Sequence, residues 1–307
     1  MGWGLIIPVM ADLIAQLKHI PINEASTYGA WLLSAFAITQ FAFSPVIGNL
    51  SDRYGRRPVL LLSLFGFGMD YIIQALAPAY GWLFLGRVIA GITGASFTTA
   101  TAYIADVSED ETARAKNFGL IGAAFGLGFV LGPALGAFLA TWGIRAPFYA
   151  AAALCLLNCL YGYFFLPESL SKENRRPFDW KRANPFGSLQ FLIKHPEIGG
   201  LAISFFLIYL GAQAVQGNWN FFTIYRFHWS DKMVGISLAV VGVLVGGVQA
   251  GLTRVINPKI GNEKSIYLGL SLYTLGLILF AFATQGWMMF AFLVPYCLGG
   301  RCWPSLQ

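Results

Sequence analysis

The sequence predicts an all-α membrane protein. Its 307 residues are 57% hydrophobic and only 11% charged, and the mean hydropathy is +0.63. An ordinary soluble domain is about 25% charged, so a soluble fold would leave too much apolar surface in water. Uncharged runs of about 20 residues, the length that a helix needs to cross a bilayer, recur along the chain. The net charge of +6 is therefore expected to mark cytoplasmic loops rather than a nucleic-acid partner.

Six apolar segments fill the first half of the chain, and each is predicted to be a membrane helix. They cover residues 1–17, 27–50, 58–77, 82–106, 117–142 and 146–166. The first is short for a complete span, and we expect natural sequence to precede it. Short polar turns separate the segments, as in a bundle of antiparallel neighbours. Residues 1–166 are therefore predicted to form an N-terminal bundle of helices 1–6.

The second half repeats this pattern after a polar stretch. Residues 167–196 carry six Lys and Arg residues and four prolines, which is typical of a cytoplasmic linker. Further apolar segments follow at 197–220, 232–256, 263–283 and from 287 onward, and we expect the last to be cut by the end of the chain. Residues 197–307 are thus predicted to form a truncated C-terminal bundle of helices 7–10, and such internal repetition is common in secondary transporters.

The charged residues predict how the chain sits in the membrane. Most of the 20 Lys and Arg residues fall in loops that one orientation places on the cytoplasmic side. Because cytoplasmic loops are enriched in these residues, we expect the loops at Arg56 and Lys181 to face the cytoplasm. Glu24 and Asp231 are then expected on the outer side.

A charged motif separates the second and third predicted helices, and it resembles a loop of the major facilitator superfamily. The family pattern is Gly-x-x-x-Asp-Arg-x-Gly-Arg-Arg or Lys, and the matching residues are Gly48, Asp52, Arg53, Gly55, Arg56 and Arg57. The resemblance implies a gate, in which Asp106, at the inner end of the fourth helix, would engage Arg53 or Arg56. The alternative is that the arginines only fix the topology.

Two ionisable residues lie within predicted spans, where each is a candidate for function. Asp70 is twelve residues past Pro58, which places it about 18 Å into the membrane. A carboxyl group near the midplane suits a proton carrier or a substrate contact, and Met69-Asp70-Tyr71 resembles the helix-3 site of tetracycline antiporters. Arg87 begins an Arg-x-x-x-Gly pattern that is associated with proton transfer in the superfamily. The alternatives are a structural carboxylate and an arginine that anchors an interface.

The fifth predicted helix carries closely spaced small residues. Gly128, Gly132, Pro133 and Gly136 resemble the helix-5 motif of superfamily antiporters. Glycines let helix backbones approach closely, and proline frees a carbonyl group. The motif is therefore expected to pack helices, although small residues are common in membrane helices generally.

Uncharged polar residues at membrane depth are the candidates for substrate binding. With Asp70, the predicted set is Gln40, Gln213, Gln216, Trp219 and Gln249. By analogy with the family, Gln40 and Asp70 match substrate-site positions. A planar amphipathic molecule suits such a lining, but an interhelical hydrogen bond is as reasonable for any one of these residues.

Taken over the whole chain, the sequence resembles the tetracycline-resistance-like branch of the drug:proton antiporters. Two positions depart from it, because Tyr273 stands where these exporters carry an Asp and Val245 where they carry a His. The resemblance implies proton-driven efflux of amphipathic drug-like molecules by a monomer in a bacterial inner membrane, powered by the proton gradient without a cofactor. The alternatives are a partial gene product that does not transport and an exporter of a non-tetracycline metabolite.

An enzyme is not expected, since no motif of a nucleophile or a metal site is present. Cysteines and histidines are scattered, and no ligand cluster for a metal is predicted.

Overall fold

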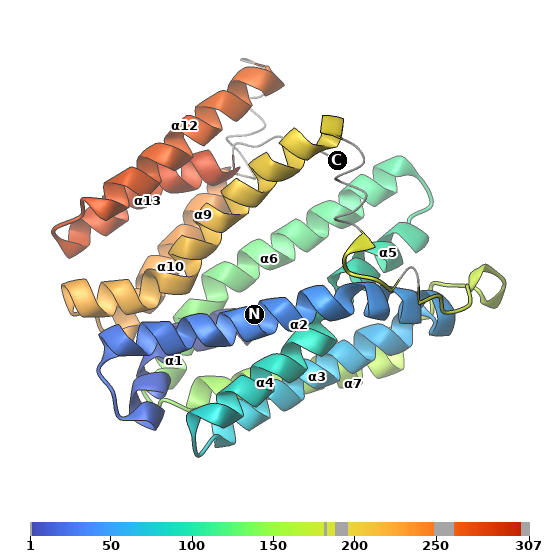
Figure 1. Cartoon of the computed structure of the whole chain (residues 1–307), viewed down its shortest axis with the longest axis horizontal. Helices are drawn as coiled ribbons and strands as arrows, with labels where there is room; N and C mark the ends of the chain where they lie inside the picture. The colour runs from blue at the N-terminus through green and yellow to red at the C-terminus, as the bar shows by residue number, and fades with distance from the viewer. Residues whose placement is uncertain (1, 181–182, 188–195, 249–260, 302–307) are drawn as a thin grey trace.

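A computed structural model of the chain is a bundle of long helices (Figure 1). It describes residues 2–180, 183–187, 196–248 and 261–301, and within these ranges the regular secondary structure is helical, without strands. The predicted all-α fold is thus confirmed.

The N-terminal half contains seven α-helices and one 3-10 turn among the described residues. They are α1 (Gly2–Lys18), α2 (Ile22–Tyr54), α3 (Arg56–Leu76), α4 (Tyr80–Thr93), η1 (Gly94–Ser96), α5 (Phe97–Asp106), α6 (Glu111–Ala140) and α7 (Ala146–Phe165). Gly55, with φ 108°, separates α2 from α3, a backbone conformation that side chains with a Cβ disfavour.

The predicted membrane segment at 82–106 corresponds to one span, Tyr80–Asp106, but its helix is not continuous, because η1 interrupts it between α4 and α5. Two side chains from neighbouring helices bind carbonyl groups at the interruption. Ser63 Oγ donates to the oxygen of Thr93 at 2.6 Å, and Gln40 Nε2 donates to the oxygen of Gly94 at 3.1 Å. These donors satisfy carbonyl groups at the end of α4, which makes the interruption tolerable inside a membrane bundle.

The later part of the chain begins with a short turn in the predicted linker and continues with long helices. The elements are η2 (Lys172–Asn174), α9 (Pro196–Phe227), α10 (Asp231–Gly247), α12 (Asn262–Ala281) and α13 (Gly286–Arg301). The first of the long helices extends seven residues beyond the predicted end at 220. The predicted end of the next helix, at 256, lies outside the described residues.

Within the described residues, five stretches are long and apolar enough to cross a membrane by length and composition. They are Ile22–Tyr54, Arg56–Leu76, Tyr80–Asp106, Ala146–Phe165 and Glu263–Ala281. Large apolar side chains cover much of the outer surface, such as Phe164 at 69% exposure. Such a surface is stable in lipid and costly in water.

Helix α6 lies between the two halves. On one side, a Cβ placed on Gly136 would lie 2.1 Å from the carbonyl oxygen of Leu5 on α1. On the other side, a Cβ on Gly235 of α10 would lie 2.9 Å from the oxygen of Pro133, and one on Gly242 would lie 2.4 Å from Val130. Glycines therefore bring three backbones into close contact at the interface between the halves.

Candidate functional site

Asp70 and Arg87 form an ion pair between α3 and α4. Arg87 Nη2 contacts Asp70 Oδ2, and Gln74 Nε2 donates to Asp70 Oδ1 at 2.7 Å. The exposed fractions of the Asp70 and Arg87 side chains are 0% and 2%. The other two ion pairs in the described part of the chain are far more exposed. A buried pair is costly to break, because the remaining charge loses its partner.

Arg87 is enclosed by aromatic rings. Its guanidinium carbon lies 5.2 Å from the ring centre of Trp3 and 5.9 Å from those of Phe36 and Tyr71. These distances favour cation–π attraction. Arg87 Nε is buried and has no hydrogen-bond partner. The guanidinium thus keeps one free donor close to its aromatic neighbours.

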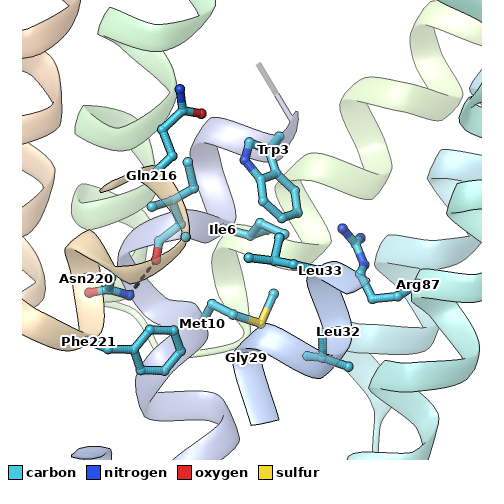
Figure 2. A pocket seen from close by; sticks show the side chains of 12 residues that line it. Trp3, Ile6, Met10, Gly29, Leu32, Leu33, Arg87, Gln216, Asn220 and Phe221 are labelled. Atoms are coloured by element: carbon cyan, nitrogen blue, oxygen red, sulfur yellow. Dashed lines mark hydrogen bonds between the residues drawn. The ribbon is translucent and has the colours of Figure 1, made fainter. Parts of the chain in front are cut away.

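A small cavity between the two halves is lined in part by Arg87 (Figure 2). Helices α1, α2, α4 and α9 contribute its walls, with Trp3, Met10, Leu33 and Gln216 among the lining residues. Its volume is about 50 Å³, roughly that of one or two water molecules. Drug-sized ligands need about 300 Å³ or more, so this conformation leaves no room for one in this cavity.

A second cavity of about 180 Å³ lies within the C-terminal half. It is lined by residues of α9, α12 and α13 that include Asn218, Trp219, Phe280 and Met289. Trp219 is buried, and its Nε1 donates to Ser237 Oγ at 3.0 Å. This cavity is mainly apolar.

The residues predicted to bind substrate do not share one cavity. Gln216 lines the first and Trp219 the second. Gln40 bonds to the carbonyl group of Gly94, and the Gln213 side chain is exposed. Gln249 lies outside the described residues. Asp70 stands behind Arg87, which is the charged residue that lines the first cavity.

Two polar residues near the first cavity were missed by the sequence analysis. Asn220 Nδ2 donates to the oxygens of Ile7 and Pro8 at 2.7 and 3.1 Å, which links α9 to α1 (Figure 2). Gln74 touches Asp70 from one helical turn away. The spacing of four residues places Gln74 on the same face as Asp70, so this contact was visible in the sequence.

Arg56 is the centre of the contacts in the charged motif. Its Nη1 bonds to Asp52 Oδ1 at 2.5 Å and to Ser51 Oγ at 2.7 Å, and its Nε bonds to Asp106 Oδ2 at 3.3 Å. Arg53 and Arg56 were both proposed as partners of Asp106, and the structure pairs Asp106 with Arg56. Arg53 is exposed and lies over the ring of Tyr54.

The remaining residues of the motif contact neighbouring elements. Arg57 Nη2 donates to the oxygen of Tyr163 on α7. Gly48 faces Thr98 on α5, where an added Cβ would lie 4.0 Å from the hydroxyl oxygen. The motif thus contacts α7 near its C-terminal end and α5 near its start.

Glu168, in the predicted linker, was missed as a partner of the motif. Its two carboxylate oxygens accept from the backbone N–H groups of Arg56 and Arg57 at 2.8 and 3.3 Å. They therefore cap the start of α3, where a negative charge is favourable. A Cβ on Gly55 would lie 2.2 Å from one of these oxygens, so glycine is also needed for the carboxylate to approach.

All four residues of the predicted helix-packing motif are buried in α6. Gly128, Gly132 and Pro133 surround Gly4 of α1, where an added Cβ would lie 3.0–3.2 Å from their atoms. Gly136 faces Leu5 of the same helix. The motif thus packs α6 against α1.

The two departures from the tetracycline exporters lie in the C-terminal half. Tyr273 is buried on α12, and its ring stacks on Tyr296 of α13 with centres 5.1 Å apart. Val245 packs at the edge of the apolar core around Trp219 and Phe280. Neither position brings a charge to this half.

A pair of carboxyl groups joins α1 to the start of α10. The Asp12 and Asp231 side chains interact by a hydrogen bond, and burial together with the Asp12 carboxylate raises the pKa of Asp231 to about 7. No group of His, Cys, Asp and Glu within the described residues has the geometry to hold a metal ion.

Comparisons with known proteins agree with the fold. A family model described as the Major Facilitator Superfamily matches residues 1–307. The chain is 42% identical to the tetracycline resistance protein, class C, of Escherichia coli, over all of this chain and 76% of that protein. It is 32% identical to multidrug resistance protein 2 of Bacillus subtilis, over 87% of this chain and 66% of that protein.

A solved structure gives the same architecture. The crystal structure of the human organic anion transporter MFSD10 (TETRAN) superposes with a TM-score of 0.77 at 24% identity. The match covers 98% of this chain and 80% of that one. This likeness concerns the fold alone.

Proposed function

Because the chain belongs to the major facilitator superfamily, we propose that it exports amphipathic drug-like molecules across a bacterial inner membrane in exchange for protons. The observation that carries the proposal is the buried Asp70–Arg87 pair beside a cavity between the halves. A carboxyl group at this place can take up and release a proton, and its charge state changes the field on the cavity through Arg87. The energy source is the proton gradient, without a cofactor.

Alternating access requires two bundles that move against each other. We propose that these are residues 1–166 and 197–307, joined by the linker 167–196. Helix α9 contacts α2, where Cβ atoms on Gly29 and Gly217 would lie 2.5 and 3.0 Å from Phe221 and Leu33. The expected topology assigns this part of α2 to the outer side. These contacts support a conformation closed on the outer side.

The motif around Arg56 is proposed to hold the inner end of the N-terminal half together. It connects α2, α3 and α5 through Asp52 and Asp106. These ion pairs are partly exposed, so their rearrangement costs little, about 1 kcal/mol or less each. Such contacts can break and reform during a transport cycle, and this supports a gating role.

The relatives named as tetracycline resistance proteins make tetracycline the first substrate to test. Tyr273 and Val245 supply no charge where an acid and a histidine are expected from the family resemblance. We therefore propose that neutral or weakly charged amphipaths are preferred over a metal-chelated cationic drug, because each missing carboxylate removes a charge partner from an apolar site.

A drug-susceptibility panel tests this proposal. Cells that express the chain should gain resistance to neutral amphipathic drugs, and Asp70→Asn should remove the resistance at equal expression. Tyr273→Asp should shift the preference toward cationic drugs. Strong tetracycline resistance from the unmodified chain, unchanged by Tyr273→Asp, would contradict the assignment of substrate class. A panel without any resistance would favour a chain that does not transport.

A further inference from the structure

Gln74 is a buried amide whose nitrogen binds Asp70 and whose oxygen has no hydrogen-bond partner. It lies on α3, one turn toward the outer end from Asp70, and its exposed fraction is 0%. Its Nε2 donates to Asp70 Oδ1 at 2.7 Å, whereas its Oε1 is buried without a hydrogen-bond partner. A buried carbonyl oxygen without a donor is costly, and such an atom calls for a functional explanation.

The two charge states of Asp70 need different partners. As a carboxylate it only accepts hydrogen bonds, and both oxygens are used, Oδ1 by Gln74 and Oδ2 by Arg87. As a carboxylic acid it has one O–H donor, which requires an acceptor within reach. Gln74 Oε1 becomes that acceptor when the amide turns by about 180°, a rotation around a torsion with two broad minima.

We propose that Gln74 is the positioning residue for proton uptake at Asp70: its amide nitrogen binds the carboxylate, and its amide oxygen binds the acid. The inference rests on the proposed function and deepens it. In the step, a proton from hydronium attaches to Asp70 Oδ1 and leaves water behind, while the Gln74 amide turns to accept the new O–H. No other bond is made or broken.

The lack of a side chain at Gly86 lets α4 approach the pair closely. Gly86 on α4 faces both side chains, and a Cβ there would lie 2.6 Å from Asp70 Oδ1 and 3.6 Å from Gln74 Cγ. The other titratable groups near Asp70 are Arg87 from α4, Tyr71 from α3 itself and Cys155 from α7. The first stays charged, and a phenol and a thiol are neutral near pH 7.

Proton uptake by Asp70 affects the first cavity through Arg87. When Asp70 is neutral, Arg87, which lines the cavity, loses its counter-charge. Its guanidinium is then free to interact with a group in the cavity. Gln74 makes this change possible without leaving the new O–H of the acid unsatisfied.

The test titrates Asp70 by difference infrared spectroscopy on the purified chain in lipid, with Asp70→Asn to assign the acid band. In Gln74→Met, which keeps the length of the side chain, the pH midpoint should rise by up to one unit, a tenfold increase in proton affinity. The reason is that a charge-assisted hydrogen bond is lost from the carboxylate and only a weaker, neutral one from the acid. Gln16→Met, at an exposed glutamine on α1, should leave the midpoint unchanged.

An unchanged midpoint in Gln74→Met would overturn the proposal. A second measurement needs no variant of Gln74: the acid band of the wild-type chain should have the low frequency of a hydrogen-bonded acid, and the frequency of an acid without an acceptor would contradict the role. Both readouts are independent of transport. A shifted midpoint in a chain without proton-coupled transport would support the role of Gln74 and refute the proposed function. An unchanged midpoint in a chain with proton-coupled transport would refute the role of Gln74 and support the proposed function.

Discussion

Removing either partner of the buried ion pair should destabilise the protein more than removing both. Asp70→Asn leaves the Arg87 guanidinium, 2% exposed, without a counter-charge, and Arg87→Gln leaves the fully buried Asp70 carboxylate without one. Breaking a buried pair in this way costs about 3–5 kcal/mol. Replacing both partners removes both charges, so the double variant should be more stable than either single variant.

The magnitude is set by the burial of the two groups. A matched control is the pair between Asp52 and Arg56, whose side chains are 38% and 12% exposed. Water screens that pair, and its loss should cost about 1 kcal/mol or less. The structure therefore predicts a strong contrast between two pairs of the same chemical type in one protein.

The assay is thermal unfolding in detergent, followed by a thiol-reactive dye that reports the exposure of Cys297, which is 1% exposed when folded. The coupling energy from the double-mutant cycle should exceed about 1.5 kcal/mol for Asp70 and Arg87. It should stay below about 0.5 kcal/mol for the control pair. Equal and additive effects at both pairs would refute the argument from burial.

Three further predictions use other parts of the structure. Gly136→Val should lower the free energy of unfolding by about 1–3 kcal/mol in the same assay, because its Cβ meets the backbone oxygen of Leu5 at 2.1 Å; unchanged stability would show that α1 and α6 separate freely. Glu168→Gln should cost about 1 kcal/mol, less at high salt, since a charged cap of α3 is lost; an effect independent of salt would contradict the charge argument. The pKa of Asp231 is raised to about 7 in the folded protein, against an ordinary 3.8. The stability that this shift contributes is complete only below pH 3.8, so the free energy of unfolding should fall by about 1–2 kcal/mol as pH rises through 7. Asp12→Asn should flatten this dependence, and an unchanged slope would exclude the acid pair as its cause.

Much of the fold was predictable because apolar runs of bilayer length are a strong signal. The pairing of Asp70 with Arg87 could also have been predicted from their positions in the sequence. Asp70 lies six residues before the end of α3, and Arg87 lies seven residues after the start of α4. Since the helices are antiparallel and joined by a short turn, these residues share one depth, and their pairing follows from counting outward from the turn.

Other features could not be derived from periodicity. Glu168 caps α3 from a segment whose path depends on tertiary packing. The interruption at Gly94 depends on donors from two other helices, Ser63 and Gln40. For the same reason, the sequence alone is equally consistent with Gln40 as a substrate contact and with Gln40 as the donor of a structural hydrogen bond. Local sequence identifies polar residues at depth, but the partner of each is set by neighbouring helices.

The most direct test of proton-coupled export uses the purified chain in liposomes that carry an imposed pH gradient and an internal pH-sensitive dye. Addition of a substrate found in the susceptibility panel should release protons down the gradient while the substrate accumulates against its own. Asp70→Asn, shown to be folded after reconstitution, should stop both movements. Substrate accumulation that persists in Asp70→Asn, or that proceeds without any movement of protons in the unmodified chain, would contradict the account.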